Sequence, residues 1–503
     1  MTVKPSWLVA NYPSEANMSE PTGQLTIGTL LFLVLVVCVA AWTDLGPAFS
    51  LLAVMACAAA VALSRKYRLA PLAGLLFVGS FKPEAATAFT ATDPTVVFLG
   101  LLAVSLSVEV LLRLSGRERF TLGDAFAGQA AGLITYLVFL AVMVTSYLYS
   151  PAALAGGIKL ARLVFISSPL FIAPFLLLND ERDFKQFFAI SLVLSLILAF
   201  RSLWEIVHGS KLQIILRGEG DITRIGDAQL LGMTIILLLY YRYTERCGRF
   251  ITILCLLVLI PGLVACAARG PIFSLMFALA IGLFGIQRNS GFVSRKAILG
   301  GLALVAIVAV SSVLWVEKFP VAKSKFMQKK SELSLFSNWQ DPGGTMGQRI
   351  DFYRRAMQGF QEKPFFGWGM GGWAVYYYGF DATSTRDPRH ALPFQPEYPH
   401  NSVLEVAIEQ GVTGLIALGL LLVAVCKRLG RLRTAAAGRY SFLVPLFLYC
   451  LAAGMFSQDI NNRVLWFWLG VIFSAARLLT LTSAETPTST VCVRLNHPSH
   501  LLH

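Results

Sequence analysis

A histidine stands where a large polar segment gives way to an apolar helix, in the run Tyr398-Pro-His-Asn-Ser-Val-Leu-Glu-Val-Ala-Ile-Glu-Gln-Gly411. Because an unperturbed imidazole titrates near neutral pH, His400 could accept or orient the proton of a substrate hydroxyl. Asn401 can cap the helix that follows. Glu405 lies about one turn further on and would face a polar cavity, since a carboxylate facing lipid is costly. The alternatives are that His400 is an interface or capping residue and that Glu405 only solvates the helix end.

Four arginines fall in segments that the topology below places on the outward side of a membrane. Arg269 follows an apolar stretch, Arg217 and Arg224 share a second outer loop, and Arg349 lies in the largest one. The planar guanidinium matches phosphate oxygens, so these residues indicate an anion site for a lipid-linked diphosphate. For Arg269 the alternative is interfacial snorkelling of a long side chain.

Neither a metal nor a cofactor is expected. The outer loops are sparse in Asp and Glu and contain no DxD, HExxH or clustered His and Cys pattern, so arginines would have to balance negative charge. The eight cysteines lie mostly inside apolar stretches and show no CxxC spacing, which gives no sign of a disulfide framework.

The composition is that of an all-α polytopic integral membrane protein. Hydrophobic residues make up 56% of the chain, charged residues 14%, and mean hydropathy is +0.66. Runs long enough to cross about 30 Å of hydrocarbon predict fourteen spans. They are 25–42, 47–64, 69–81, 95–112, 128–149, 160–178, 187–205, 227–241, 250–268, 270–286, 297–315, 401–426, 440–456 and 463–478.

Clusters of Lys and Arg orient these spans, because short cytoplasmic loops concentrate basic residues. All the clusters fall on one side of the alternating spans, and they account for most of the net charge of +14, so nucleic-acid binding is not expected. The predicted organisation is a cytoplasmic segment (1–24), transmembrane helices (25–315), a large outward-facing loop domain (316–399), further transmembrane helices (400–480) and a disordered cytoplasmic tail (481–503).

The outward-facing loop domain holds 84 residues and many aromatic side chains, which favours an ordered structure. Residues 348–361 carry apolar side chains at helical spacing, at Ile350, Tyr353, Met357 and Phe360. They predict an amphipathic helix that packs against the membrane or the spans. The glycine-rich stretch 363–372 predicts a turn whose backbone can approach a ligand closely. Within the spans, Glu109 and Arg201 are expected to face the bundle in structural pairs.

Several of these segments together resemble one family. They are Ala268-Arg269-Gly270 after an apolar span, Arg349-Ile-Asp-Phe-Tyr-Arg-Arg-Ala-Met357, Lys363-Pro-Phe-Phe-Gly-Trp-Gly-Met-Gly371 and His400-Asn-Ser-Val-Leu-Glu-Val-Ala-Ile-Glu-Gln-Gly411. Over about residues 250–425 the chain is similar to the bacterial O-antigen ligase and polymerase superfamily. It departs from the family in having Ala268 where a serine is usual, and in having fourteen spans where twelve are commoner.

The resemblance implies a metal-independent glycosyltransferase of the GT-C type with about 12–14 transmembrane helices. The enzyme would act at the periplasmic face of the bacterial inner membrane and take an undecaprenyl-diphosphate-linked glycan as donor. Carried over by motif, Arg269 and His400 match family residues, and Arg224 matches the arginine before the eighth span, in competition with Arg217. The acceptor would be lipid A core, another lipid-linked repeat or a different surface polymer.

Arg224 and Arg269 would stabilise the leaving diphosphate, His400 would act on the acceptor hydroxyl, and attack from the back side would invert the anomeric centre. Arg349, Asn401 and Glu405 would complete the substrate site. Two rival functions are transport of a polyprenyl-linked glycan or small solute, and a membrane scaffold without activity. A transporter should show interrupted helices or repeat symmetry around a midplane site.

Overall fold

The structure is a computed structural model of the 503-residue chain. It describes residues 67–81, 93–115, 129–208, 224–244, 248–266, 268–286, 344–379, 398–435, 442–457 and 459–484, together with residues 123, 126 and 440. The predicted spans 25–42, 47–64 and 297–315 lie outside the described residues, as does Arg217.

Throughout the described ranges the regular structure is helical. The helices are α3 (Ala70–Phe77), η2 (Val78–Ser80), α4 (Pro94–Leu114), α6 (Ala130–Leu148), α7 (Ala153–Arg162), η3 (Leu163–Ser167), α8 (Ser168–Leu177), α9 (Glu181–His208), α11 (Arg224–Thr244), α12 (Arg249–Ala265), α13 (Arg269–Ile286), α16 (Gly344–Glu362), α17 (Gly372–Tyr378), α18 (Ser402–Ala435), α19 (Leu443–Ser457) and α20 (Arg463–Ala484).

Each predicted span that falls within the described residues overlaps a helix. Five helices are long and apolar enough to cross a bilayer: Pro94–Leu114, Ala130–Leu148, Ala153–Leu177, Glu181–Trp204 and Ser402–Leu432. The third of these begins earlier than the predicted span 160–178, because a π-helical turn joins α7 to α8 without a break. Within the described ranges, six shorter apolar helices of 10–17 residues pack with them.

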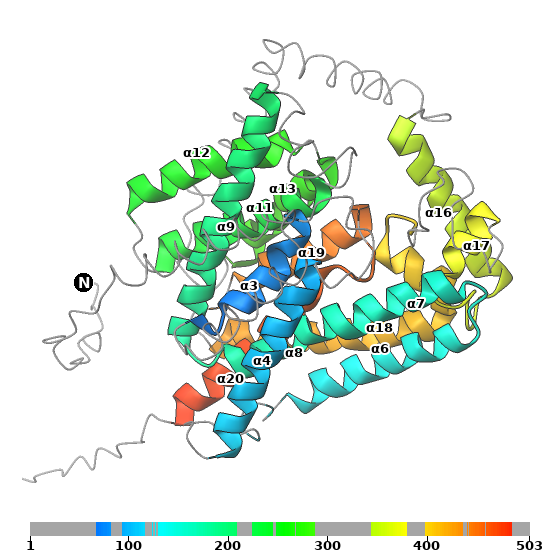
Figure 1. The fold of residues 1–503 in the computed structure, drawn as a ribbon, viewed down its shortest axis with the longest axis horizontal. Coiled ribbons are helices and arrows are strands. Elements are labelled where there is room, and N and C mark those ends of the chain that lie inside the picture. The colour runs from blue at the N-terminus through cyan, green and yellow to red at the C-terminus, as the bar shows by residue number, and fades with distance from the viewer. Residues whose placement is uncertain are drawn as a thin grey trace, which may run out of the picture.

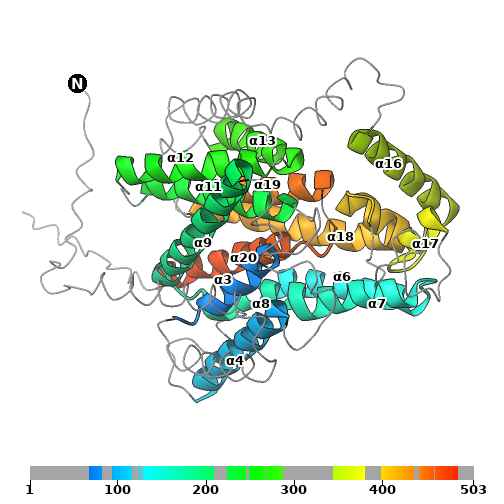
Figure 2. The ribbon, with the colours of Figure 1, turned by 45° about the horizontal axis from the view of Figure 1, so that its top comes forward.

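The helices α6, α7 and α18 lie side by side, and α16 and α17 cover one end of them (Figures 1 and 2). The side chain of Gln410 bonds to Ser146 at 3.3 Å, and that of Arg428 bonds to Gln129 at 3.1 Å. These two contacts make α6 and α18 antiparallel. The first two turns of α18 therefore extend past the end of α6, towards α16 and α17.

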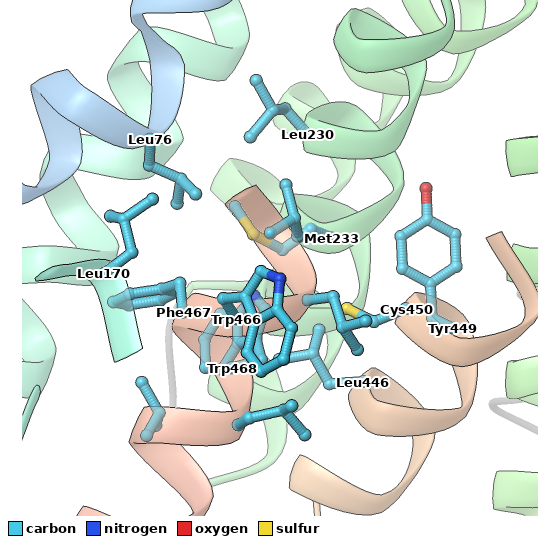
Figure 3. Close-up of a cluster of buried hydrophobic side chains, with 14 of the residues drawn as sticks. Leu76, Leu170, Leu230, Met233, Leu446, Tyr449, Cys450, Trp466, Phe467 and Trp468 are labelled. Carbon is cyan, nitrogen blue, oxygen red and sulfur yellow. The ribbon is translucent and has the colours of Figure 1, made fainter. Parts of the chain in front are cut away.

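The core of the bundle is aromatic at its centre. Trp466 and Trp468 of α20 are fully buried, and Leu446 and Cys450 of α19 and Met233 of α11 lie around them (Figure 3). The Tyr449 hydroxyl reaches back to α11 and donates to the carbonyl of Gln229 at 3.0 Å. This contact fixes the relative height of α11 and α19.

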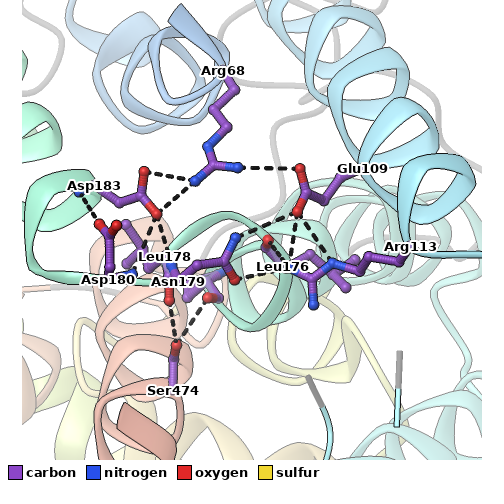
Figure 4. Close-up of polar contacts among 10 residues, drawn as sticks. Arg68, Glu109, Arg113, Leu176, Leu178, Asn179, Asp180, Asp183 and Ser474 are labelled. Atoms are coloured by element: carbon purple, nitrogen blue, oxygen red, sulfur yellow. Dashed lines mark hydrogen bonds and ion pairs between the residues drawn. The ribbon is translucent and has the colours of Figure 1, made fainter. Parts of the chain in front are cut away.

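A buried ion network ties α3, α4 and α9 together at the end of the bundle opposite α16. Glu109 accepts from Arg113 at 2.9 Å and from Arg68 at 3.3 Å, and Arg68 also binds Asp183 at 2.7 Å (Figure 4). Because a charge buried in an apolar bundle needs a partner, this network is a structural one. It confirms the prediction that Glu109 faces the bundle in a pair.

The second predicted in-membrane group is also paired. Arg201 of α9 binds Asp227 of α11 at 2.5 Å and donates to the Ser80 carbonyl at 2.5 Å. The ion pair links α9 with the first turn of α11, and the Ser80 contact adds the end of η2. The prediction that Arg201 faces the bundle in a structural pair is confirmed.

Replacing Glu109 tests how much the buried network stabilises the bundle. We expect Glu109→Ala to lower the free energy of unfolding by about 3–5 kcal/mol, because it leaves the buried Arg113 without its carboxylate. The matched control is Glu181→Ala, which removes a surface pair with Lys185 whose side chains are 40% and 43% exposed, and it should cost less than about 1 kcal/mol. Equal losses in thermal unfolding of the purified variants would contradict a structural role for the network.

Candidate functional site

The start of α18 is shaped by His400 and Asn401. The Asn401 carboxamide oxygen accepts from the backbone N–H groups of Val403 at 3.0 Å and Leu404 at 3.1 Å, so Asn401 is the helix cap that the sequence predicts. The backbone of His400 is left-handed, with φ +55°. That conformation costs a non-glycine residue about 1–2 kcal/mol. The surrounding contacts therefore hold His400 in place.

Two aromatic rings hold the half-buried imidazole of His400. The Phe352 ring of α16 stacks on it at 5.7 Å between centroids, and the Tyr398 ring meets it edge-on at 4.7 Å. Phe352 belongs to a second apolar cluster, with Ala356, Trp373 and Ile408. The segment 344–379 thus contributes directly to the surroundings of His400.

Directly behind His400, a fully buried lysine joins two carboxylates of α18. The Nζ atom of Lys159, on α7, lies 2.7 Å from Glu405 and 2.5 Å from Glu409. The second oxygen of Glu405 accepts the backbone N–H of Ile460 at 2.9 Å, in the turn between α19 and α20. Glu405 therefore holds three parts of the bundle together and is not a solvated helix-end residue.

Charged groups of both signs lie around the phenol of Tyr398. Burial raises the pKa of Tyr398, and the carboxylates of Asp459 and Glu405 raise it further, while Arg349 and Arg162 lower it. Burial also raises the pKa of Asp459, which Arg162 opposes. The region between α16, α18 and the α19–α20 turn thus brings buried charged groups of both signs together.

Helix α16 brings Arg349 to this region, and the predicted helix over 348–361 is confirmed. Tyr353 donates to the Met455 carbonyl of α19 at 3.4 Å, while Phe352 and Ala356 are buried. Met357 is exposed and lies off the face that packs against α18. That face is closely packed at Gly359, where an added Cβ would lie 2.5 Å from Ile408 of α18. The small residues, rather than the large ones, define the contact.

The glycine-rich turn closes on the backbone of α18. At Gly411 the backbone has φ +66° and ψ −154°, which interrupts the helix. Val412 N–H donates to the Pro364 carbonyl at 2.7 Å, and Thr413 N–H to that of Phe365 at 3.2 Å. In the other direction, the N–H groups of the turn at 368 and 369 donate to the carbonyls at 408 and 409, at 2.9 and 2.8 Å. The close approach predicted for the turn is thus to the protein's own backbone.

Glycine is required in this turn for two reasons. Gly367, Gly369 and Gly371 all have positive φ, of 70°, 82° and 80°. A Cβ on Gly367 would also lie 2.5 Å from the backbone of Glu409, and one on Gly371 would lie 2.6 Å from that of Gly156. The alternating glycines therefore let the turn fit between α18 and the start of α7.

Arg224 and Arg269 begin α11 and α13, and the contacts of neighbouring residues place both helix starts at one end of the bundle. Asp227 pairs with Arg201, and the adjacent Ser202 lies 3.5 Å from the sulfur of Cys266 at the end of α12. The start of α11 also contacts α19, through the Tyr449 hydroxyl and the Gln229 carbonyl. About one turn further along α19, the Gly454 carbonyl accepts from the Ser402 hydroxyl at the start of α18, at 3.1 Å. The side chains of the two arginines are outside the described residues.

Sequence reasoning missed the contributions of Lys159, Tyr398, Asp459 and Phe352. Lys159 lies one residue before the predicted span 160–178 and so was not treated as an in-membrane charge. An isolated lysine in an otherwise apolar stretch was the available signal. Within the described residues, no three His, Cys, Asp or Glu side chains form a group suited to a metal ion.

The fold and the enclosed polar site define a polytopic, all-helical membrane protein with a site at one end of its bundle. Residues 253–419, roughly a third of the chain, match the family described as O-antigen ligase. This segment contains Arg269, Arg349 and His400, and its match supports the similarity to the O-antigen ligase and polymerase superfamily. The predicted resemblance is confirmed.

One relative is a Haemophilus influenzae protein described as uncharacterized. It is 26% identical over 155 residues, which cover 31% of this chain and 37% of the relative. The match thus spans little more than a third of the length of that protein.

Substitution at Gly411 tests the interrupted helix. We expect Gly411→Ala to destabilise the protein by about 2–3 kcal/mol, because its φ and ψ lie in a region that only glycine occupies readily. A Cβ there would also lie 2.6 Å from the Phe365 backbone. Gly419→Ala on the same helix is the control, since nothing lies within 4 Å of its Cβ position. Thermal unfolding of both variants in detergent decides the outcome, and similar melting temperatures would argue against a fixed break at Gly411.

Neutralising Lys159 tests the buried charges behind His400. We expect Lys159→Met to cost about 3–5 kcal/mol of unfolding free energy, because the buried carboxylates of Glu405 and Glu409 lose the ammonium that pairs with both of them. Adding Glu405→Gln and Glu409→Gln should recover most of that loss. Unfolding measurements on the single and triple variants check this. If the triple variant is no more stable than the single one, the cost does not come from uncompensated charge.

Proposed function

We propose that this protein is a glycosyltransferase of the GT-C type in the bacterial inner membrane. It transfers a glycan from undecaprenyl diphosphate to a sugar hydroxyl of the acceptor at the periplasmic face, without a metal ion or cofactor. The proposal is supported by one observation above the others. Within the bundle, the helix starts at Arg224 and Arg269 lie at the same end as His400. Arg269 and His400 also fall inside the segment matched by the O-antigen ligase family.

The chemistry follows from the residue types at that end. The oxygen of the acceptor hydroxyl attacks the anomeric carbon from the side opposite the diphosphate, so the configuration at that carbon inverts. The bond from carbon to the diphosphate oxygen breaks, and its electron pair leaves on undecaprenyl diphosphate. Arg224 and Arg269 stabilise the charge that develops there. His400 takes the hydroxyl proton and later releases it to water.

Positioning residues complete this assignment. Asn401 caps α18 and Phe352 stacks on the imidazole, so the orientation of His400 is fixed before substrate arrives. Arg349 lies on the helix that carries Phe352 and adds positive charge near Tyr398. Glu405 is committed to Lys159 and the Ile460 amide, so its role is to position the start of α18 rather than to contact the substrate.

A ligase-type acceptor, such as lipid A core, is favoured, and a second lipid-linked repeat is the alternative. The two differ only in which hydroxyl reaches His400. The enclosed polar region does not itself distinguish them, so the acceptor has to be identified from the product.

The interruption of α18 at Gly411 is the feature that could favour transport as the function, because transporters bind their substrates at broken helices. At Gly411, however, the carbonyls of Ile408 and Glu409 and the N–H groups of Val412 and Thr413 all bond to the glycine-rich turn. These backbone groups are occupied by protein and do not face a cavity. The break therefore supports attachment of the outward-facing segment more than it supports transport.

Activity assays on purified variants test the proposal. We expect His400→Ala to lower glycan transfer at least 100-fold while lipid-linked donor still binds, because general-base catalysis contributes about 10²–10⁴-fold. Arg269→Lys should reduce both donor binding and transfer, since lysine keeps the charge and loses the bidentate fork. The control is Arg355→Lys, on the exposed face of α16, which should keep near-normal activity.

Near-normal transfer by His400→Ala would remove the imidazole from the mechanism. The same assay with lipid A core or with a second lipid-linked repeat as acceptor separates ligase from polymerase. Movement of intact donor across the bilayer by proteoliposomes, without a new glycosidic bond, would replace the proposal with transport.

A further inference from the structure

Two phenylalanines of the glycine-rich turn are exposed although the turn itself is firmly held. Phe365 and Phe366 are 68% and 65% exposed. Large apolar side chains in adjacent exposed positions on a rigid turn call for a partner, because their contact with water is unfavourable.

The turn is rigid because its backbone is bonded on two sides. Its carbonyls at Pro364 and Phe365 accept from α18, and the Phe366 carbonyl accepts from the Tyr149 hydroxyl at the end of α6, at 2.5 Å. The two phenylalanine side chains are therefore presented outward from a fixed place between α6 and α18.

That place continues the lipid-facing surface of both helices. On α6 the exposed residues nearest the turn are Val144 and Leu148, and on α18 the series begins at Ile416, three residues after the bond to Thr413. Because α6 and α18 are two of the helices that are long and apolar enough to cross a bilayer, these exposed residues face hydrocarbon. The phenylalanines extend that apolar surface to its outer edge.

Lys363, two residues before the pair, has the chemistry of a headgroup layer. The Lys363 ammonium lies 3.8 Å from the centre of the Trp368 ring, on the side of the turn nearer α16. Cationic and amphipathic aromatic side chains gather where hydrocarbon meets lipid headgroups. Phe365 and Phe366 are apolar, and Lys363 and Trp368 beside them carry a cation and an amphipathic ring. This order matches the change in a lipid leaflet from acyl chains to phosphate headgroups.

We propose that Phe365 and Phe366 form a membrane anchor, inserted among the acyl chains at the edge of the leaflet on the α16 side, with Lys363 at the phosphate level. The occupant of this surface is phospholipid, and not a second copy of the chain or a soluble protein.

The anchor fixes the height of the candidate site, and this consequence rests on the proposed function. The turn is bonded to α18 at Gly411, and Ser402–Gln410 separates it from His400. At a rise of 1.5 Å per residue, nine helical residues span about 13 Å. The imidazole would thus be held a fixed distance outward from the hydrocarbon edge, where the diphosphate of a lipid-linked donor lies.

Photo-crosslinking of the full-length protein in nanodiscs of phosphatidylethanolamine and phosphatidylglycerol tests the anchor without using activity. Benzoylphenylalanine replaces Phe366 in one variant and Phe365 in a second, since it preserves the aromatic ring that the turn presents. After irradiation, adducts are identified by mass spectrometry. We expect both variants to form phospholipid adducts with a yield within about twofold of the lipid-facing control Ile416→benzoylphenylalanine. Arg355→benzoylphenylalanine, on the charged face of α16, should give at least tenfold less.

Absence of lipid adducts at both positions, with normal adducts at Ile416, would overturn the anchor. Adducts with a second copy of the chain at both positions would overturn it as well and identify a protein interface instead. Because neither outcome depends on glycan transfer, a failure here is distinct from a failure of the proposed function.

Discussion

The hydrogen-bonding requirement of a helix broken within a membrane bundle is the constraint on which the rest of this structure depends. Lipid offers no partners to the amides and carbonyls that a break exposes, so protein must supply them. Here the glycine-rich turn supplies them at Gly411, with two bonds in each direction. The segment 344–379 is consequently joined to α18 through backbone as well as side chains, and this attachment holds α16 where Phe352 contacts the imidazole of His400.

Charge provides the second connection between the bundle and the site. Lys159 holds Glu405 and Glu409, and Glu405 in turn holds the α19–α20 turn at Ile460. These contacts satisfy one another inside the bundle. The buried ionic groups at this end of the protein therefore position α18, and under the proposed function the arginines at the helix starts are the groups that bind the substrate anion.

Hydropathy and basic clusters predicted most of what the structure describes of the bundle, because the length and polarity of a span are local properties of the sequence. The cap at Asn401 and the arginine-bearing helix starts were predictable for the same reason. The partner of Glu405 was not, since it lies 246 residues away on α7. The close contact of α16 with α18 at Gly359 was not predicted either, because spacing of apolar residues does not show where a helix needs a small one. The roles of Arg224, Arg269 and His400 remain predictions.

The distance along the chain between Lys159 and its carboxylates has a consequence for biogenesis. Lys159 is synthesised 246 residues before Glu405. At roughly 5–20 residues per second, about 12–50 s pass before its counter-ions exist. During that interval the ammonium of Lys159 has neither of its carboxylate partners. Final seating of α7 against α18 therefore waits until the start of α18 has been synthesised.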